Sequence, residues 1–335
     1  MAFVNNYFSV FSNLFSGNLF RRTIRKSLVL HLSPFYDKMT AMKKKALTIC
    51  FLALLMLLSA CSLGKPKPTP DPHAGQVYLY DGYDWVWYTP IEGVEVNAFS
   101  KSDFAYIDGE PVYLGTGYTL QKGIDVSEHQ KEINWDAVGT MHYDFCYVRI
   151  GRRGYTEGGL FEDTFFRRNY EGAKRCGMEL GVYFFSQAVS VTEAIEEAEW
   201  VLSTLKNYPV TLPVVFDWEV VEAENARTAN VDVATRTDCA VAFCETIRRA
   251  GYEACVYYNR TTGYYRYDLS RLTAYPVWFA LPCSPPDIIH PSFYYHIDMW
   301  QYSLTGQVPG ISLETDLDYI FVPVAEEVEE TVSRN

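Results

Sequence analysis

The stretch Pro213-Val214-Val215-Phe216-Asp217-Trp218-Glu219 decides the fold, because a run of apolar β-forming residues ends in two carboxylates that flank one aromatic ring. Side chains alternate between the two faces of a strand, so Asp217 and Glu219 point the same way with Cα atoms roughly 6.6 Å apart. Such a pair suits acid/base chemistry, since burial and mutual repulsion raise the pKa of one carboxyl. The alternative is a strand that simply ends in solvent, where acidic residues are common.

Strands and helices alternate along the chain on both sides of this stretch. We expect strands at residues 145–150, 180–185, 254–258, 277–280, 297–301 and 319–322, and helices at residues 161–176, 190–205 and 235–250. Ser190 with Glu193 forms a capping-box pattern, and Gly177 and Gly251 follow helix ends. Repeated strand–helix units with continuously apolar strands predict an α/β fold with a parallel sheet closed into a barrel, which loses its helices toward the C-terminus.

Further acidic residues fall at equivalent strand ends. Asp125 lies in the short strand Gly123-Ile124-Asp125-Val126-Ser127, and Asp316 and Asp318 come just before the last expected strand. Active sites of such barrels lie at the face where the parallel strands end. If the first and last strands are neighbours, Asp125 and Asp316 converge on the same mouth as Asp217 and Glu219. Each acid taken alone is better explained as an ordinary loop or capping residue.

The first 75 residues are expected to lie outside the fold. Residues 42–61 combine Met42-Lys43-Lys44-Lys45, a short apolar run and Leu58-Ser59-Ala60-Cys61, which predicts a lipoprotein signal peptide with a lipobox Cys61. An uncleaved membrane anchor is the alternative. Residues 1–41 precede this better start and are interpreted as a non-native extension, while residues 62–75 form a Pro-rich linker. We therefore expect export and lipid anchoring at the outer face of a bacterial cell membrane or in the envelope.

Charge and cysteine content narrow the possible partners. The chain has 29 basic and 41 acidic residues; residues 1–61 hold eight basic and one acidic residue, so the remainder has a net charge of −19. This excess of acid disfavours nucleic acid as a partner. Six cysteines follow Cys61 without zinc-site spacing, so no metal or cofactor is expected. Cys146 and Cys255 lie in apolar runs that favour buried free thiols, although export would permit disulfides.

Six blocks of sequence resemble glycoside hydrolase family 25, the lysozyme-type muramidases, and occur in the family's order. They are Gly-Ile-Asp-Val-Ser-Glu-His-Gln (123–130), Gly-Val-Tyr-Phe-Phe-Ser (181–186), Val-Val-Phe-Asp-Trp-Glu (214–219), Trp-Gln-Tyr-Ser (300–303), Val-Pro-Gly-Ile (308–311) and Asp-Leu-Asp (316–318). The resemblance implies an irregular (β/α) barrel with about eight strands and five helices over residues 121–325. A small β-rich segment, residues 76–120, would precede it, and an acidic tail, residues 326–335, would follow it.

The resemblance also implies an activity and residue roles. The activity is hydrolysis of the β-1,4 bond between N-acetylmuramic acid and N-acetylglucosamine in peptidoglycan, by a monomer without a cofactor. Glu219 would be the general acid/base and Asp217 its partner carboxylate, while Asp125 and Asp316 match the other two acidic positions better than Asp318 does. The expected substrate-binding residues are Tyr183, Phe185, Tyr258, Trp278, Trp300 and Gln301. Lys131 departs from the family, which often has Gly there, and this puts the local turn in question.

Several alternatives stay open at this level. Either a carboxylate or the substrate's own acetamido group could attack the sugar, and we favour the substrate-assisted route with retention. Arg149 is either a buried partner of an acid or an edge residue, and the loop residue His129 is expected to face solvent. A wall-binding lipoprotein without activity and an envelope protein whose acids only confer solubility are the competing functions. The presence of all four acids favours the hydrolase.

Overall fold

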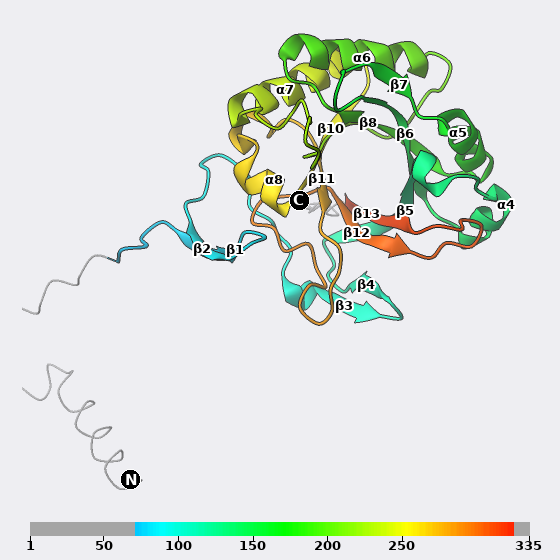
Figure 1. Ribbon diagram of the computed structural model, residues 1–335. Helices are drawn as coiled ribbons and strands as arrows, with labels where there is room; N and C mark the ends of the chain where they lie inside the picture. The colour runs from blue at the N-terminus through cyan, green and yellow to red at the C-terminus, as the bar shows by residue number, and fades with distance from the viewer. Residues whose placement is uncertain (1–70, 325–335) are drawn as a thin grey trace, which may run out of the picture. The chain divides into compact units, whose positions relative to one another are not determined.

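The computed structural model describes residues 71–324. The expected signal peptide with Cys61, most of the linker and the acidic tail lie outside these residues. Residues 73–324 belong to one compact unit. Within residues 71–324, eight strands close into a barrel (Figure 1): β5 (Tyr118–Val126), β6 (Phe145–Arg153), β8 (Glu179–Ser186), β9 (Val214–Trp218), β10 (Ala254–Asn259), β11 (Val277–Ala280), β12 (Met299–Gly306) and β13 (Thr315–Pro323). The predicted barrel is confirmed.

Strand β13 makes the barrel irregular. Seven strands run parallel, whereas β13 is antiparallel to both of its neighbours, β12 and β5. The remaining closure is the parallel pairing of β5 with β6. An antiparallel strand needs no helical crossover, so the last part of the barrel can be built from direct connections.

Helices cover the outside of the barrel in its first part only (Figure 1). The described residues contain five α-helices: α4 (Trp135–Val138), α5 (Phe166–Arg175), α6 (Val191–Leu205), α7 (Val233–Arg249) and α8 (Arg260–Tyr265). Short 3-10 turns lie at η1 (Lys101–Asp103), η2 (Glu128–Gln130), η3 (Gly139–Met141) and η4 (Leu269–Arg271). The predicted loss of helices toward the C-terminus is confirmed, since no α-helix lies between β11 and β13. None of the helices in residues 71–324 is long and apolar enough to cross a membrane.

Among the predicted boundaries that are wrong, two affect the site. The helix expected at residues 161–176 begins only at Phe166, because residues Leu160–Glu162 form β7, which pairs antiparallel with the end of β6. Asp163 turns the chain between them, since its carboxylate accepts the backbone N–H of Phe165 at 2.9 Å. The last strand begins at Thr315 rather than residue 319, so Asp316 and Asp318 lie within the strand.

Alternation along the strands separates two apolar layers. In β9, Val215 faces the barrel interior, where it packs with residues such as Phe145 and Trp278. Val214 and Phe216 face outward and pack in the larger cluster between the sheet and the helices. Every second residue of each barrel strand therefore belongs to the interior, and at the strand ends this face becomes the wall of the mouth.

The segment before the barrel forms two small hairpins that are packed on it. One consists of β1 (Val77–Tyr80) and β2 (Trp85–Tyr88), the other of β3 (Phe104–Ile107) and β4 (Glu110–Tyr113). Tyr295, in the β11–β12 connection, shares a hydrogen bond with the Tyr88 hydroxyl at 3.0 Å and accepts the N–H of Ile91 at 2.8 Å. Tyr319 of β13 donates to the Pro111 carbonyl at 3.0 Å. These contacts attach both hairpins to the C-terminal part of the barrel.

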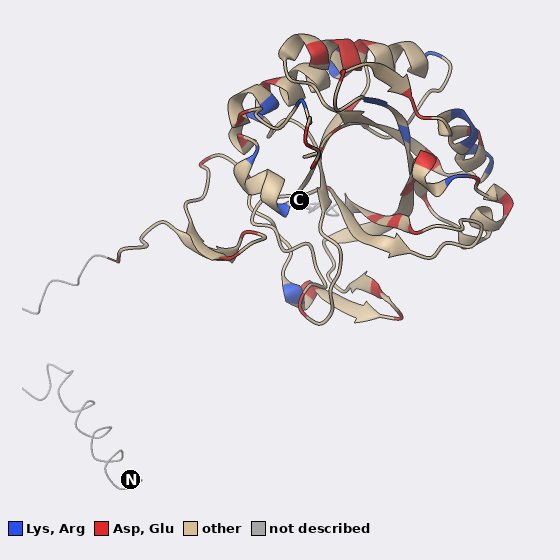
Figure 2. Ribbon diagram, viewed as in Figure 1, with Lys and Arg blue, Asp and Glu red and all other residues tan. Residues whose placement is uncertain are grey.

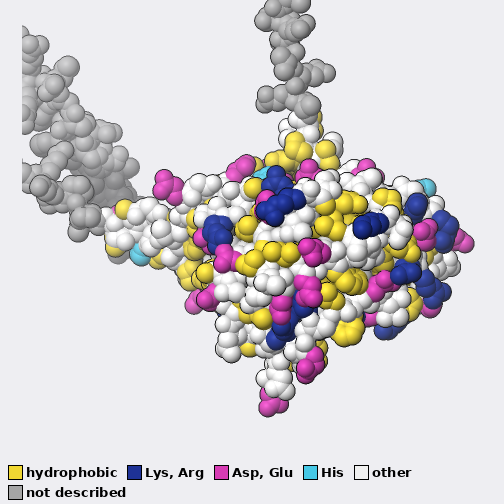
Figure 3. Space-filling model, turned by 90° about the horizontal axis from the view of Figure 1, so that it is seen from above, with side chains coloured by type: hydrophobic (Ala, Val, Ile, Leu, Met, Phe, Trp, Pro, Cys, Tyr) yellow, Lys and Arg dark blue, Asp and Glu magenta, His cyan; other side chains and the backbone are white. Residues whose placement is uncertain are grey.

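The state of the cysteines and the charge on one face of the surface can be compared with what the sequence predicts. The six described cysteines are unpaired, and Cys146 and Cys255 are fully buried. On the face seen in Figure 3, acidic and basic side chains intermingle with hydrophobic ones, and no continuous basic stripe crosses it. That face offers no electrostatic footprint for a polyanion.

Candidate active site

A cavity of about 440 Å³ opens where the parallel strands end. Its lining includes eight residues expected from the sequence: Asp125, Tyr183, Phe185, Asp217, Glu219, Trp278, Gln301 and Asp316. Seven more were not expected there: Ser127, His129, Gln130, Arg149, Tyr257, Leu304 and Glu314. The volume lies in the range of small-molecule sites. Acidic side chains dominate the charged groups of this lining.

The four expected acids meet because of strand direction. Asp217 is inward-facing near the end of β9, and Glu219 follows that strand directly. Asp125 lies near the end of β5, opposite Asp316 in the β5–β13 register. Since β13 runs antiparallel, its beginning lies at the same end of the barrel as the finish of β5. The convergence expected from barrel closure is therefore present in the structure.

Asp318 lies deeper than Asp316 on the same face of β13. Its side chain is fully buried, and it accepts a hydrogen bond from the Trp278 indole nitrogen at 3.0 Å. Burial raises the pKa of Asp318 well above its usual range, with further contributions from Asp125 and Asp316. Asp316, not Asp318, lines the cavity.

Asp217 and Glu219 form a carboxyl pair with raised pKa values. Burial raises the pKa of Asp217 well above its usual range, and the neighbouring charges of Glu219 and Asp125 raise it further, while Arg149 opposes them. Burial also raises the pKa of Glu219. The Oδ1 atom of Asp217 is buried and has no hydrogen-bond partner. The pair therefore holds a proton to a higher pH than isolated carboxyls do, and Asp217 has an acceptor left for a ligand's donor.

Asp125 receives its charge stabilisation from a hydrogen-bonded chain. Gln301 donates through Nε2 to Asp125 Oδ2 at 2.8 Å, and the Tyr257 hydroxyl donates to Gln301 Oε1 at 2.8 Å. Burial raises the pKa of Asp125 to about 6, although the bond from Gln301 lowers it. Across the β5–β13 pair, burial and then the charges of Asp125 and Glu219 raise the pKa of Asp316 to about 8.

Two of the expected substrate-binding residues lie outside the cavity. Tyr258 packs among the outer aromatic residues, with ring contacts to Tyr267 and Phe293. Trp300 is also outward-facing and donates its indole N–H to the Leu281 carbonyl at 2.8 Å. Side chains alternate along a strand, and in these two strands the neighbouring residues Tyr257 and Gln301 point into the barrel. Tyr258 and Trp300 therefore point outward. Cys255 and Met299 point into the barrel. Counting two residues on from each of them would have identified Tyr257 and Gln301 as inward-facing.

Arg149 and His129 contribute to the wall of the cavity. The Arg149 Nε donates to Asp163 Oδ2 at 2.7 Å, and its Nη2 lies 3.0 Å from Glu128 Oε1. Arg149 is thus a buried ion-pair partner, but of Asp163 and Glu128 rather than of the four predicted acids. Burial, followed by the nearby Arg149 charge, lowers the pKa of His129. His129 is exposed to solvent, as expected, and it also lines the cavity.

The turn at Lys131 forms although the family often has Gly at this position. Ser127 N–H donates to Gln130 Oε1 at 2.8 Å, which holds the short η2 turn beside the cavity. Lys131 follows with φ of 58° and ψ of −136°, a conformation that favours glycine. The chain therefore keeps the turn at the cost of local backbone strain.

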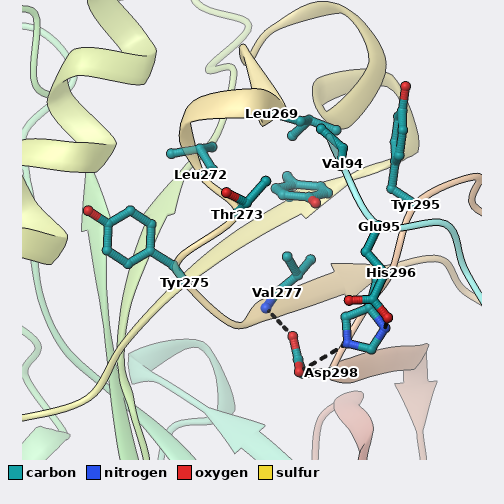
Figure 4. Close-up of a pocket in the computed structure, with 11 residues that line it drawn as sticks. Val94, Glu95, Leu269, Leu272, Thr273, Tyr275, Val277, Tyr295, His296 and Asp298 are labelled. Atoms are coloured by element: carbon teal, nitrogen blue, oxygen red, sulfur yellow. Dashed lines mark hydrogen bonds and ion pairs between the residues drawn. The ribbon is translucent and has the colours of Figure 1, made fainter. Parts of the chain in front are cut away.

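Another cavity, of about 70 Å³, shares no lining residue with the first (Figure 4). Its lining includes Val277 at the start of β11 and Asp298 just before β12. Asp298 accepts the Val277 N–H at 2.7 Å and contacts His296 at 3.3 Å. Its walls are largely apolar, and it has no carboxyl pair at a strand end. Among residues 71–324, no group of three or more His, Cys, Asp or Glu is arranged to hold a metal ion.

Comparisons with known proteins agree with this geometry. The autolytic lysozyme of Clostridium acetobutylicum is 27% identical over 198 residues, covering 59% of this chain and 55% of that protein. Lysozyme M1 of Streptomyces globisporus is 28% identical over 208 residues, covering 58% of this chain and 66% of that protein. The chain thus spans only part, about half to two thirds, of the length of these relatives.

A solved structure gives the same fold. The modular autolysin LytC from Streptococcus pneumoniae, determined in complex with a synthetic peptidoglycan ligand, superposes with a TM-score of 0.53 and 26% identity. The match covers 64% of this chain and 51% of that one. The model of glycosyl hydrolases family 25 matches residues 124–311, which run from the last three residues of β5 through β12. The chain belongs to glycosyl hydrolases family 25.

Proposed function

We propose that the chain is a 1,4-β-N-acetylmuramidase that cleaves the bond between N-acetylmuramic acid and N-acetylglucosamine in peptidoglycan, with Glu219 as general acid/base. The observation that carries this proposal is the carboxyl pair at the end of β9, which faces one cavity together with Asp125 and Asp316. Family membership and the lysozymes among the relatives support the choice of substrate.

In the proposed first step, Glu219 protonates the glycosidic oxygen as the bond to the anomeric carbon breaks. The substrate's acetamido oxygen attacks that carbon and forms a cyclic, positively charged intermediate. From substrate binding onward, the acetamido N–H donates to Asp217, whose Oδ1 has no partner in the free protein. This hydrogen bond favours ionised Asp217, so the proton of the pair is held by Glu219.

The second step returns the enzyme to its starting state. A water molecule attacks the anomeric carbon and reopens the ring of the intermediate, while Glu219 accepts the proton of that water. Two inversions at one carbon give net retention. Direct attack by a carboxylate is the competing route, and it also gives retention. A covalent glycosyl-enzyme adduct detected by mass spectrometry of trapped protein would favour that route.

The proposed activity is tested by Glu219→Gln in the full chain, with Glu222→Gln as matched control, because Glu222 is exposed in the loop that follows β9. Mass spectrometry measures muropeptides released from defined peptidoglycan. Loss of the general acid should lower turnover by about 10²–10⁴-fold while the control keeps wild-type turnover. Near-normal turnover by Glu219→Gln would refute the assignment. Wild-type protein that binds the wall without releasing muropeptides would instead identify an inactive wall-binding protein.

We also propose that the chain is exported and works as a monomer tethered through a lipid on Cys61. The charged and apolar pattern of residues 42–61 supports the anchor. Several acyl chains at one terminus hold a protein at a membrane far better than one chain does. Incorporation of a labelled fatty acid that is lost in Cys61→Ala tests the anchor. Equal labelling of both proteins would contradict it.

A further inference from the structure

The β1–β2 hairpin exposes an entire face of aromatic rings. Tyr78 and Tyr80 alternate with apolar residues in β1, and they pair across the hairpin with Trp87 and Trp85. Their exposed fractions are 56%, 37%, 47% and 58%, in the order named. The rings contact one another, as in the stacked pair of Tyr78 and Trp85 with centroids 5.4 Å apart. A contiguous aromatic surface of this kind on a small hairpin is typical of an interaction site.

The opposite face holds the hairpin in place. Leu79 and Tyr88 pack against the main apolar cluster. The Tyr265 hydroxyl at the end of α8 donates to Asp81, whose other carboxylate oxygen accepts the N–H groups of Tyr83 and Asp84 in the hairpin turn. The aromatic face is therefore presented by an anchored element, which lowers the ordering cost of binding.

A groove of about 730 Å³ runs beside this face, and we call it the hairpin groove. Tyr78, Tyr80 and Trp85 form one wall, and Arg260, His290 and Ser292 lie in the other. The groove belongs to a different part of the molecule from the catalytic cavity, with which it shares no lining residue. Its aromatic wall also precedes the segment matched by the family, which begins at residue 124.

Buried polar groups in the groove wall lack partners. Arg260 is only 7% exposed and donates through Nη2 to the Ser292 hydroxyl at 2.7 Å, whereas its Nε has no hydrogen-bond partner. The guanidinium carbon lies 5.4 Å from the centre of the Tyr80 ring. The Nδ1 atom of His290 is also buried and unpartnered. A ligand with hydroxyl and amide groups would satisfy both atoms.

Charge distinguishes between the possible occupants. Residues 73–100, which include the hairpin, contain Asp81, Asp84, Glu92 and Glu95 and no Lys or Arg, and Figure 2 shows the hairpin without blue. Anionic lipid and nucleic acid both require accessible basic residues at the contact, whereas Arg260, the basic residue of the groove lining, is only 7% exposed. An uncharged sugar chain requires none: its C–H faces pack on rings while its hydroxyl and acetamido groups hydrogen-bond at the edges.

We propose that the hairpin groove is a second binding site, specific for β-linked N-acetylated glycan chains. It rests on the proposed function only for the choice of polymer, since its residues are separate from the acids of the cavity. The groove would hold the chain of an insoluble substrate while another part of the same or a neighbouring chain occupies the cavity. Two linked contacts of this kind increase avidity for the polymer.

The test uses the full chain carrying Glu219→Gln, so that the glycan is not cut. Calorimetry with a soluble oligomer of β-1,4-linked N-acetylglucosamine should detect two sites. Adding Tyr80→Ala and Trp85→Ala, both in the groove wall, should remove one site and weaken binding to purified peptidoglycan sacculi at least about tenfold. Tyr106→Ala, an exposed aromatic on the other hairpin, is the matched control and should keep both sites. Trp85→Phe should keep most of the affinity because it keeps a ring, and it serves if the alanine pair does not fold.

The outcomes separate this proposal from the one on activity. If the cavity binds no glycan, one site remains and the alanine pair abolishes it, which supports the hairpin groove while the catalytic proposal fails. Unchanged site number and sacculus affinity in the alanine pair would overturn the groove. The proposal would also be overturned if the alanine pair lost binding only to vesicles of phosphatidylcholine and phosphatidylglycerol and kept its binding to sacculi. That result would identify the hairpin as a membrane contact.

Discussion

Replacing Gln301 by Leu should shift the pH dependence of the proposed hydrolysis. The Gln301 amide donates to Asp125 Oδ2 at 2.8 Å, and both side chains are 4% exposed. Leu has a similar size but no donor, so the ionised form of Asp125 loses its amide partner. Since that bond lowers the pKa of Asp125, its removal raises this pKa.

The size of the shift follows from the strength of the bond. A hydrogen bond to a charged group contributes about 1.5–3 kcal/mol, which corresponds to a pKa increase of about one to two units. Burial already raises the pKa of Asp125 to about 6. At about pH 6 the ionised fraction would then fall from about half to about a tenth or a hundredth. If turnover requires ionised Asp125, the rate at this pH falls about fivefold to fiftyfold.

The assay is the release of reducing ends from peptidoglycan, measured between pH 4 and 9 under saturating substrate. The acid limb should move to higher pH in Gln301→Leu, with recovery of the rate on the alkaline side. Tyr257→Phe is the graded control: it removes only the bond that orients Gln301, so the limb should move the same way by less. An acid limb at the wild-type pH, with a uniform loss of rate, would refute the role assigned to ionised Asp125.

Three further changes test the stability of the site. Lys131→Gly should relieve the positive φ and raise the free energy of unfolding by about 1 kcal/mol, or Tm by about 2–4 °C; calorimetry that shows a lower Tm would contradict the strain. Asp163→Ala leaves buried Arg149 without its closer carboxylate and should lower the free energy of unfolding, measured in urea, by about 3 kcal/mol. Asp163→Asn should recover part of this loss. An unchanged midpoint of urea unfolding in Asp163→Ala would exclude this role. Burial raises the folded pKa of Asp316 to about 8, so its stabilising contribution is complete below about pH 4 and is lost as the pH rises toward 8; Asp316→Asn should therefore lose less Tm over this range, and parallel curves would contradict the shift.

The barrel and the convergence of acids were predictable because they depend on simple patterns. Continuous apolar strands indicated a parallel sheet, and closure of that sheet made β5 and the last strand neighbours. The direction of β13 was not part of the prediction, yet it determines how Asp316 reaches the mouth. Because β13 starts at the mouth, an acid near its beginning lies at the mouth. In the parallel strands, it is the acids near the strand ends that lie there.

The face of an individual aromatic residue was less predictable. Tyr258 and Trp300 lie in segments that resemble the family, but resemblance of a segment does not determine which of two neighbours points inward. Parity resolves it only when an interior residue of the same strand is known. In β10 that residue is Cys255, which identifies Tyr257, and in β12 it is Met299, which identifies Gln301.

Contacts between distant segments could not be read from the sequence at all. Asp163 lies between β7 and α5, where we expected the first turn of a helix. Its carboxylate instead accepts from the Arg149 guanidinium and from the Glu128 backbone N–H. Residues 160–162 form β7 in place of one helical turn because they pair with the free edge of β6. This tertiary contact overrides the local helix propensity.

The distribution of hydrogen-bond donors explains how four carboxyls at the barrel mouth and a fifth just below it lie close together. Asp125, Asp217, Glu219, Asp316 and Asp318 cannot all be ionised, because each charge raises the pKa of its neighbours. The amide from β12 reaches Asp125, so the free protein can keep a negative charge there. Asp217 has an oxygen without any donor, so its ionisation waits for a ligand. Substrate that supplies this donor would leave Glu219 as the carboxyl that carries the transferable proton, which couples binding to the protonation state that catalysis requires.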